Sequence, residues 1–148
     1  MPLTQVPQQM IAGGPAFSAY ANASTSIPTA SITKVNFQVE DFDTNNNFAS
    51  SRFTPTVAGY YQLNASVQFT GSTTNPLCYI TKNGSQVKCG SYTTGTFTGP
   101  VSVVSGLVYL NGTTDYVEVA AYHATGSSVN TIAAADTTRF DASLVRPA

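Results

Sequence analysis

The sequence is short of charge. Asp, Glu, Lys and Arg make up 9% of its 148 residues, against roughly 25% in a typical soluble domain. The formal net charge is -1, which leaves no basic surface of the kind that binds nucleic acid or an anionic membrane. The polar surface must therefore consist of neutral Thr, Ser, Asn, Gln and Gly, or be covered by further copies of the chain.

Long apolar runs and a secretion signal are missing as well. No stretch approaches the roughly 20 apolar residues of a membrane span. Residues 1–14 (MPLTQVPQQMIAGG) have neither the basic start nor the apolar run of a signal peptide. If the sequence is complete, we expect folding in the cytoplasm, followed by release through a route such as virus assembly and lysis.

Residues that carry catalysis are scarce. The single histidine, His123, lies beside a Gly/Ser-rich loop, and no G-x-S-x-G elbow supplies a nucleophile. There is no phosphate-binding loop, zinc-ligand spacing or dinucleotide fingerprint. We therefore expect neither enzyme activity nor a cofactor, and we interpret His123 as a surface or packing residue.

One acidic segment partly resembles a calcium-binding loop. Asp41, Asp43 and Asn45 alternate as at the start of such a loop. Its sixth place holds Asn46 where glycine is required, and its twelfth holds Arg52 where a carboxylate is required. We therefore expect no metal site here, but a loop stabilised by Asx turns.

Apolar residues recur with a period of two. In residues 61–70 the apolar side chains share one face and polar side chains the other, which predicts a half-buried strand. Similar alternation occurs at residues 34–39, 116–122 and 139–144. Short strands joined by Gly, Asn, Pro and Thr turns predict one all-β domain, a sandwich, barrel or jelly roll, at residues 15–148. We expect residues 1–14 to form a short extended N-terminal arm, a candidate attachment peptide.

The segment Val101–Leu110 (VSVVSGLVYL) is apolar on both faces over much of its length. A sandwich strand needs apolar groups on one face only. A second apolar face implies cover by another layer or another subunit. A central strand lying under a loop is the alternative.

Two Asn-Gly pairs predict tight turns. Asn83-Gly84 and Asn111-Gly112 are the strongest hairpin signals in the sequence, because a type I′ turn needs φ > 0 at both central residues. We therefore predict a β-hairpin at each pair.

The first of these turns places the two cysteines. A two-residue loop at residues 83–84 puts Cys78 directly opposite Cys89, facing inward with Ile80 and Val87. Opposed cysteines can form a disulfide, whereas folding in the cytoplasm favours two buried thiols. Both alternatives stay open.

From Phe37 the chain reads FQVEDFDTNNNFASSRFTPTVAGYYQL. The spacing of its aromatic residues, closing on Gly-x-Tyr at residues 59–61, resembles the signature of C1q-like globular domains. The resemblance covers residues 15–146. Two features depart from it: the gap from Phe48 to Phe53 is about two residues short, and Leu63 and Ala65 stand where the family prefers aromatic residues.

The resemblance implies a ten-stranded C1q/TNF-like jelly roll in two sheets, assembled as a homotrimer around a threefold axis, with ligands bound by surface loops. Candidate ligand-binding aromatic residues are Tyr92, Phe97, Tyr116 and Tyr122. These residues could stack on sugars or anchor a partner, or they could cover the trimer contact, which we favour.

No collagen-like stalk precedes the domain. In this respect the sequence resembles the C1q-like domains of bacteria and phages more than those of animal complement proteins. We hypothesise a trimeric virion surface protein, a bacteriophage fibre tip or decoration. Its arm would attach to other virion proteins, and its loops would meet a host glycan or protein. The alternative is an adhesion or matrix module of a bacterial secreted protein, located at the cell surface or outside the cell. A small hydrolase on a jelly roll is a third hypothesis, for which the sequence offers no candidate catalytic site.

Overall fold

The computed structural model describes residues 13–148, and every regular element in that range is a β-strand. The predicted arm at residues 1–14 lies outside the described residues except for Gly13 and Gly14. Nowhere in residues 13–148 is there a helix with the length and hydrophobicity of a membrane span.

One layer is a five-stranded sheet, called here the β7 sheet. Its strands are antiparallel and follow the order β12-β7-β15-β1-β4. Their bounds are β12 Val101–Leu110, β7 Gly59–Gln68, β15 Arg139–Pro147, β1 Ala16–Tyr20 and β4 Val39–Asp43.

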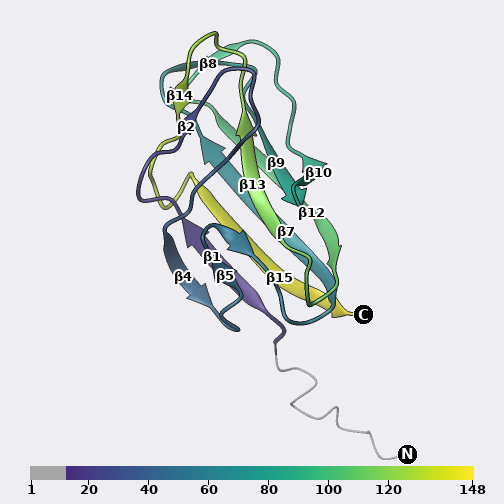
Figure 1. The fold of residues 1–148 in the computed structure, drawn as a ribbon. Coiled ribbons are helices and arrows are strands. Elements are labelled where there is room, and N and C mark those ends of the chain that lie inside the picture. The colour runs from purple at the N-terminus through teal and green to yellow at the C-terminus, as the bar shows by residue number, and fades with distance from the viewer. Residues whose placement is uncertain (1–12) are drawn as a thin grey trace, which may run out of the picture.

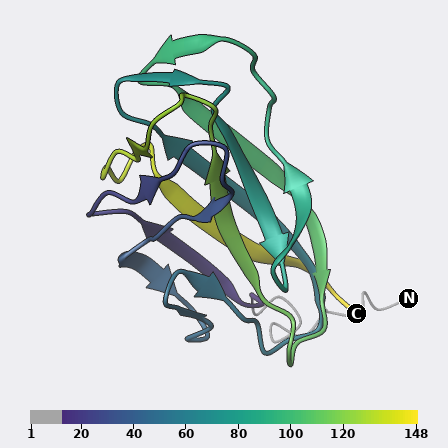
Figure 2. The ribbon, with the colours of Figure 1, turned by 45° about the horizontal axis from the view of Figure 1, so that its top comes forward.

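The other layer, the β13 sheet, follows the order β10-β9-β13-β6-β5, with β3 paired to β13. Its strands are β10 Ser85–Cys89, β9 Leu77–Lys82, β13 Val117–Tyr122, β6 Arg52–Phe53, β5 Phe48–Ala49 and β3 Thr33–Lys34. Two small ladders complete the fold: β8 (Ser72–Thr74) with β11 (Thr96–Thr98), and β2 (Ser26–Ile27) with β14 (Val129–Asn130). The two main sheets face each other as the layers of a sandwich (Figures 1 and 2).

Aromatic side chains fill the core between the sheets. Phe17 from β1 stacks on Phe48 and Phe53, with ring centroids 4.5 and 4.7 Å apart, and meets the edge of Phe140 at 4.9 Å. Tyr61 is fully buried, and its burial raises the pKa of the phenol to about 12. Phe48, Phe53 and Tyr61 belong to the motif of residues 37–63, whose spacing is thus explained by contacts in one cluster. The predicted all-β sandwich is confirmed.

The clearest predicted strand is also confirmed. In β7 the apolar side chains of residues 61, 63, 65 and 67 are buried, and the polar ones between them face outward. The alternation at residues 34–39 is only partly expressed as a strand. Val35 and Phe37 are buried as predicted, but residues 35–38 lie between strands. The N–H of Phe37 donates to Ser51 Oγ at 2.8 Å, and Ser51 Oγ donates back to the Phe37 carbonyl at 3.1 Å. A serine hydroxyl replaces the sheet partner here.

The hairpin predicted at Asn111-Gly112 is wrong. β12 and β13 belong to different sheets, so residues 111–116 cross from one layer to the other. Asn111 Oδ1 accepts the backbone N–H groups of Thr113, Thr114 and Asp115, at 2.9 to 3.0 Å. The asparagine thus organises a crossover loop instead of a two-residue turn.

The hairpin at Asn83-Gly84 is confirmed, with φ of 52° and 80° at its two residues. The predicted opposition of the cysteines is wrong, because the register shifts between residues 86 and 88. Cys89 pairs with Tyr79, while the N–H of Gly90 donates to the carbonyl of Cys78. Cys78 is buried, Cys89 and Val87 are exposed, and both cysteines are free thiols.

Candidate binding surfaces

Strand β12 presents a row of apolar side chains to solvent. Val101, Val103, Leu107 and Tyr109 are between 42% and 53% exposed, while the residues between them point into the core or are small. β12 ends the strand order of its sheet, and no other part of residues 13–148 covers these side chains. This rules out the alternative of a central strand under a loop.

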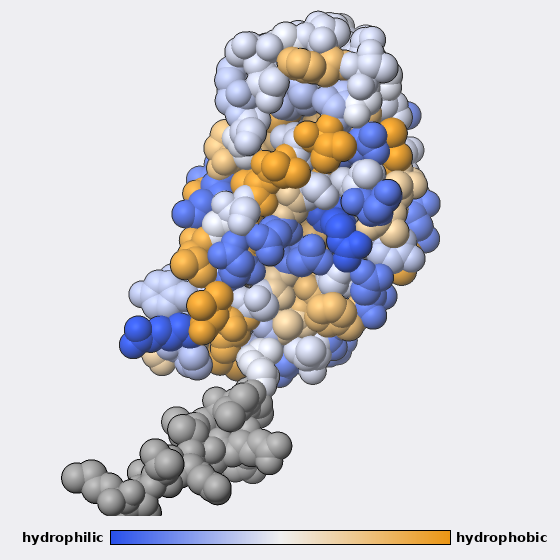
Figure 3. All heavy atoms as spheres, turned by 180° about the vertical axis from the view of Figure 1, so that it is seen from behind, coloured by the Kyte–Doolittle hydropathy of each residue, from blue (hydrophilic) through white to orange (hydrophobic). Residues whose placement is uncertain are grey.

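The apolar surface extends onto the neighbouring strands. Tyr60 of β7 and Val145 of β15 are exposed on the same side, and the Tyr60 and Tyr109 rings lie 5.5 Å apart. We call this outward side of β12, β7 and β15 the apolar face. Viewed from that side, apolar side chains gather on either side of a polar belt (Figure 3). Clusters of exposed apolar side chains rimmed by polar residues mark interaction surfaces.

Neutral side chains make up one half of the belt. Gln62 Nε2 donates to Ser105 Oγ at 2.8 Å and to Asn64 Oδ1 at 3.1 Å. Ser105 Oγ donates to Asn64 Oδ1 at 2.8 Å. These groups hydrogen-bond each other, so covering them with another molecule leaves few polar atoms without a partner.

Charged side chains make up the other half. Arg139 contacts Asp41 at 2.9 Å, Asp141 at 3.5 Å and Ser18 Oγ at 2.6 Å. Asp41 therefore serves an ion pair on the sheet surface. The neighbouring Asp43 accepts the N–H of Asn45 at 3.2 Å, which is the Asx turn expected for this loop.

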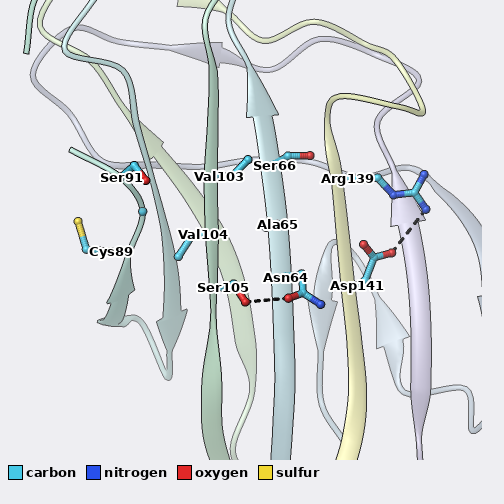
Figure 4. A pocket seen from close by; sticks show the side chains of 11 residues that line it. Asn64, Ala65, Ser66, Cys89, Ser91, Val103, Val104, Ser105, Arg139 and Asp141 are labelled. Atoms are coloured by element: carbon cyan, nitrogen blue, oxygen red, sulfur yellow. Dashed lines mark hydrogen bonds and ion pairs between the residues drawn. The ribbon is translucent and has the colours of Figure 1, made fainter. Parts of the chain in front are cut away.

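A hollow of about 510 Å³ crosses the belt. It is lined by Val103 and Ser105 from β12, Asn64 and Ser66 from β7, and Arg139 and Asp141 from β15. Figure 4 shows the Asn64–Ser105 hydrogen bond and the Arg139–Asp141 ion pair on these strands. The small side chains at its floor leave room for a protruding side chain of a second molecule.

The four predicted aromatic residues are not brought together. Tyr92 is 64% exposed and lies, with Tyr122 of β13, near Tyr79 on the outward side of the β13 sheet. Burial raises the pKa of the Tyr79 phenol, and the neighbouring Tyr122 and Tyr92 raise it further. Phe97 lies instead at a small hollow beside Val103, near the start of β12.

Tyr116 belongs to a separate charged cluster on the β13 sheet. The Arg52 guanidinium lies 3.8 Å from the centre of the Tyr116 ring, and its Nε donates to Glu118 at 3.0 Å. Lys34 Nζ contacts the same Glu118 oxygen at 2.7 Å. Burial alone would raise the pKa of Glu118, but hydrogen bonds from Lys34 and Arg52 outweigh it and lower the pKa.

His123 is a packing residue. It is fully buried, with its ring at an edge-on angle to Phe69. The N–H of Thr125 donates to Nδ1 at 3.2 Å, so Nε2 carries the proton and donates to the carbonyl of Ile27 at 2.8 Å. Within residues 13–148 there is also no group of three or more side chains suited to hold a metal ion.

Several solved structures have a similar arrangement of strands. The globular domain of the zebrafish complement 1qA protein matches with a TM-score of 0.59 and 20% identity, over 91% of this chain and 99% of that one. Murine APRIL matches with a TM-score of 0.67 and 13% identity, over 89% of this chain and 99% of that one. Eiger TNF from S. frugiperda matches with a TM-score of 0.65 and 8% identity, over 92% of this chain and 95% of that one. The chain has the C1q/TNF jelly-roll fold.

At these identities the likeness establishes the fold alone. No protein-family model and no curated protein sequence matches the chain. The family resemblance of the motif at residues 37–63 is therefore supported at the level of the C1q/TNF fold.

The doubly apolar pattern of β12 indicated the apolar face, but the sequence did not show how far that face extends and missed a second surface. Tyr60 and Val145 belong to the apolar face only because strand pairing places them beside β12. The cluster of Lys34, Arg52 and Glu118 joins three segments far apart in the chain, so no local pattern could reveal it.

Proposed function

We propose that this chain is a non-enzymatic binding and structural module that works as a homotrimer, with the apolar face at the contact between copies. The observation that carries the proposal is the row of exposed apolar side chains on β12, continued by Tyr60 and Val145. Burying such side chains removes apolar surface from water, which drives protein association. The number three rests on the resemblance to C1q-like domains.

The remaining features of the apolar face agree with burial between copies. The neutral half of the belt satisfies most of its own hydrogen bonds, so it can be covered at little cost in desolvation. Strand β12 itself carries no charged side chain, as is common at the centres of protein interfaces. The exposed side chains of Leu107 and Tyr109 and the hollow lined by Val103 are different surfaces, and a contact between unlike surfaces closes into a ring when the rotation allows.

Light scattering after gel filtration tests the assembly. We expect a particle of three times the chain mass of 15.5 kDa at micromolar concentration. Val103→Asp places a charge on the apolar face and should yield a folded monomer. Ile32→Asp is the matched control, because Ile32 is also exposed (45%, against 53% for Val103) but lies directly before β3, which pairs with β13 in the other sheet. A monomeric wild type, or dissociation by both substitutions, would refute the proposal.

We further propose that the trimer is a virion surface protein, a bacteriophage fibre tip or decoration attached through residues 1–14 to other virion proteins. Its support is the charge-poor sequence and the resemblance to C1q-like domains of phages. Its outward surfaces would meet a host glycan or protein. Imaging of purified particles with this chain located in them is the test. Recovery of the chain only from a bacterial cell surface would instead favour the adhesion or matrix module.

A further inference from the structure

A second hollow, of about 530 Å³, lies on the β13 sheet, away from the apolar face. It is bounded by the β5–β6 hairpin and the segment before it, and we call it the Arg52 hollow. Its lining includes Lys34, Arg52, Asn46 and Thr54, and no acidic residue. Two cations without a carboxylate on its walls are unusual in a chain whose net charge is -1. The hollow is therefore locally positive.

The Arg52 guanidinium is held in one orientation. One face of its plane packs on the Tyr116 ring at 3.8 Å, and its Nε is fixed by Glu118 at 3.0 Å. Within residues 13–148 the two terminal nitrogens of Arg52 make no hydrogen bond to the protein. These nitrogens form the planar fork that binds carboxylates and phosphates through two parallel hydrogen bonds.

The rim of the hollow has a fixed backbone and free polar groups. Asn46 adopts positive φ, at 54°, and the turn at Ser50 and Ser51 is held by two hydrogen bonds between the Ser51 hydroxyl and the backbone of Phe37. The Asn46 amide and the Thr54 hydroxyl donate to no group in the described part of the chain, and they face a hollow large enough for a small ligand.

We propose that the Arg52 hollow binds the carboxylate of an acidic sugar. The Arg52 fork grips the carboxylate, Lys34 adds a second positive charge, and Asn46 and Thr54 bond ring hydroxyls. Glu118 neutralises one of the two cations, and the single charge left over suits a monoanion better than a phosphate dianion. This goes beyond the proposed trimer, and because the hollow is built within one chain, the two proposals succeed or fail independently.

An NMR titration of the full chain with D-glucuronate tests the proposal. D-glucose, which has the same ring without the carboxylate, and inorganic phosphate serve as parallel probes. We expect saturable shifts at the Arg52 Nε–H and at the backbone amides of residues 46–54 and Thr56 with glucuronate, none with glucose, and weaker binding of phosphate. No saturation with glucuronate, equal shifts with glucose, or tighter binding of phosphate would overturn the assignment.

Variants separate the fork from its charge. Arg52→Gln should weaken glucuronate binding at least about tenfold, because both charge-assisted bonds are lost. Arg52→Lys keeps the charge but loses the planar fork, so its affinity for glucuronate should lie between those of the wild type and Arg52→Gln. Arg146→Gln is the matched control, since Arg146 is exposed and lies outside this hollow. Undiminished binding by Arg52→Gln, in a variant whose spectrum shows the native fold, would refute the role of Arg52.

Discussion

At the scale of single residues, the turn at Ser50 and Ser51 shows why an unfavourable backbone conformation can persist in a folded protein. Both serines have positive φ, 51° and 58°, in the two-residue loop between β5 and β6. Serine adopts this conformation less readily than Asn or Gly. The Ser51 hydroxyl, however, satisfies the backbone N–H and carbonyl of Phe37, which have no strand partner. The strained turn is kept because it supplies a buried hydrogen-bonding group.

Substitutions of these two neighbouring serines should differ in their effect on the free energy of unfolding. Ser51→Ala should lower the free energy of unfolding by about 1–3 kcal/mol, because a buried N–H loses its acceptor. Ser50→Ala, in the same turn but exposed, should change it little. Urea unfolding of the two variants measures the difference, and equal losses would contradict the role given to the Ser51 hydroxyl.

The two thiols should differ sharply in reactivity. Burial raises the pKa of Cys78 to about 11, whereas Cys89 is exposed. In the dilute single chain at mildly alkaline pH, we expect a thiol reagent to modify Cys89 before Cys78, and Cys78 only after unfolding, as read by mass spectrometry of the intact chain.

Mild oxidation should form no bond between Cys78 and Cys89 within one chain. Gly90 occupies the position opposite Cys78, and a Cβ there would lie 2.4 Å from the Val103 carbonyl oxygen. Cys89 therefore cannot slide into register without displacing β12. Recovery of a chain lighter by two hydrogens after oxidation would contradict this.

At the scale of elements, Asp115 ties the β9–β10 hairpin to the β12–β13 crossover. Its carboxylate accepts from Asn83 Nδ2 and contacts Lys82 Nζ, both at 2.7 Å, and accepts the N–H of Asn111 at 3.0 Å. The hairpin turn at Asn83-Gly84 and the crossover loop at Asn111-Gly112 thus depend on one acidic residue. Hydrogen bonds from Lys82 and then Asn83 lower the pKa of Asp115 below its ordinary 3.8.

The direction of that shift fixes a pH dependence. A lowered pKa in the folded state means that Asp115 stabilises the protein above about pH 4 and that this contribution is lost as pH falls through the folded-state pKa. The wild type should therefore exceed Asp115→Asn in unfolding free energy at neutral pH, and the difference should shrink in acid. Urea unfolding at several pH values measures it, and a difference independent of pH would contradict the assignment.

Elements also show what the sequence could predict. The strand at residues 61–70 was predictable because one buried face imposes a period of two on any sequence. The fate of Asn111-Gly112 was not, since a tight-turn signal does not say whether the strands on either side pair or cross between sheets. The register of Cys89 depends on how closely residue 90 approaches Val103, a contact across the sandwich. The Arg52 hollow likewise depends on segments that meet only after folding.

At the scale of the whole molecule, most of the few charged side chains form ion pairs within the chain. Lys34 and Arg52 share Glu118, Lys82 pairs with Asp115, and Arg139 pairs with Asp41 and Asp141. The apolar face carries its contacts through Val, Leu and Tyr side chains. Association between copies should therefore depend on apolar burial and not on ion pairs.

Salt distinguishes the two driving forces. At about 1 M NaCl charges are screened beyond roughly 3 Å, yet we expect sedimentation to report the same trimer as at low salt. Association that weakened steadily with added salt would indicate instead that ion pairs hold the copies together.

The pairing of charges within the chain also affects the rate at which copies associate. Proteins with strong complementary fields are steered toward one another, whereas nearly neutral surfaces meet by undirected diffusion, at about 10⁵–10⁶ M⁻¹ s⁻¹. For the proposed trimer, two chains must then collide many times before one encounter has the right orientation. Its assembly should therefore be fastest where newly made chains are most concentrated, for example on neighbouring ribosomes of one message, and should slow in proportion as the chains are diluted.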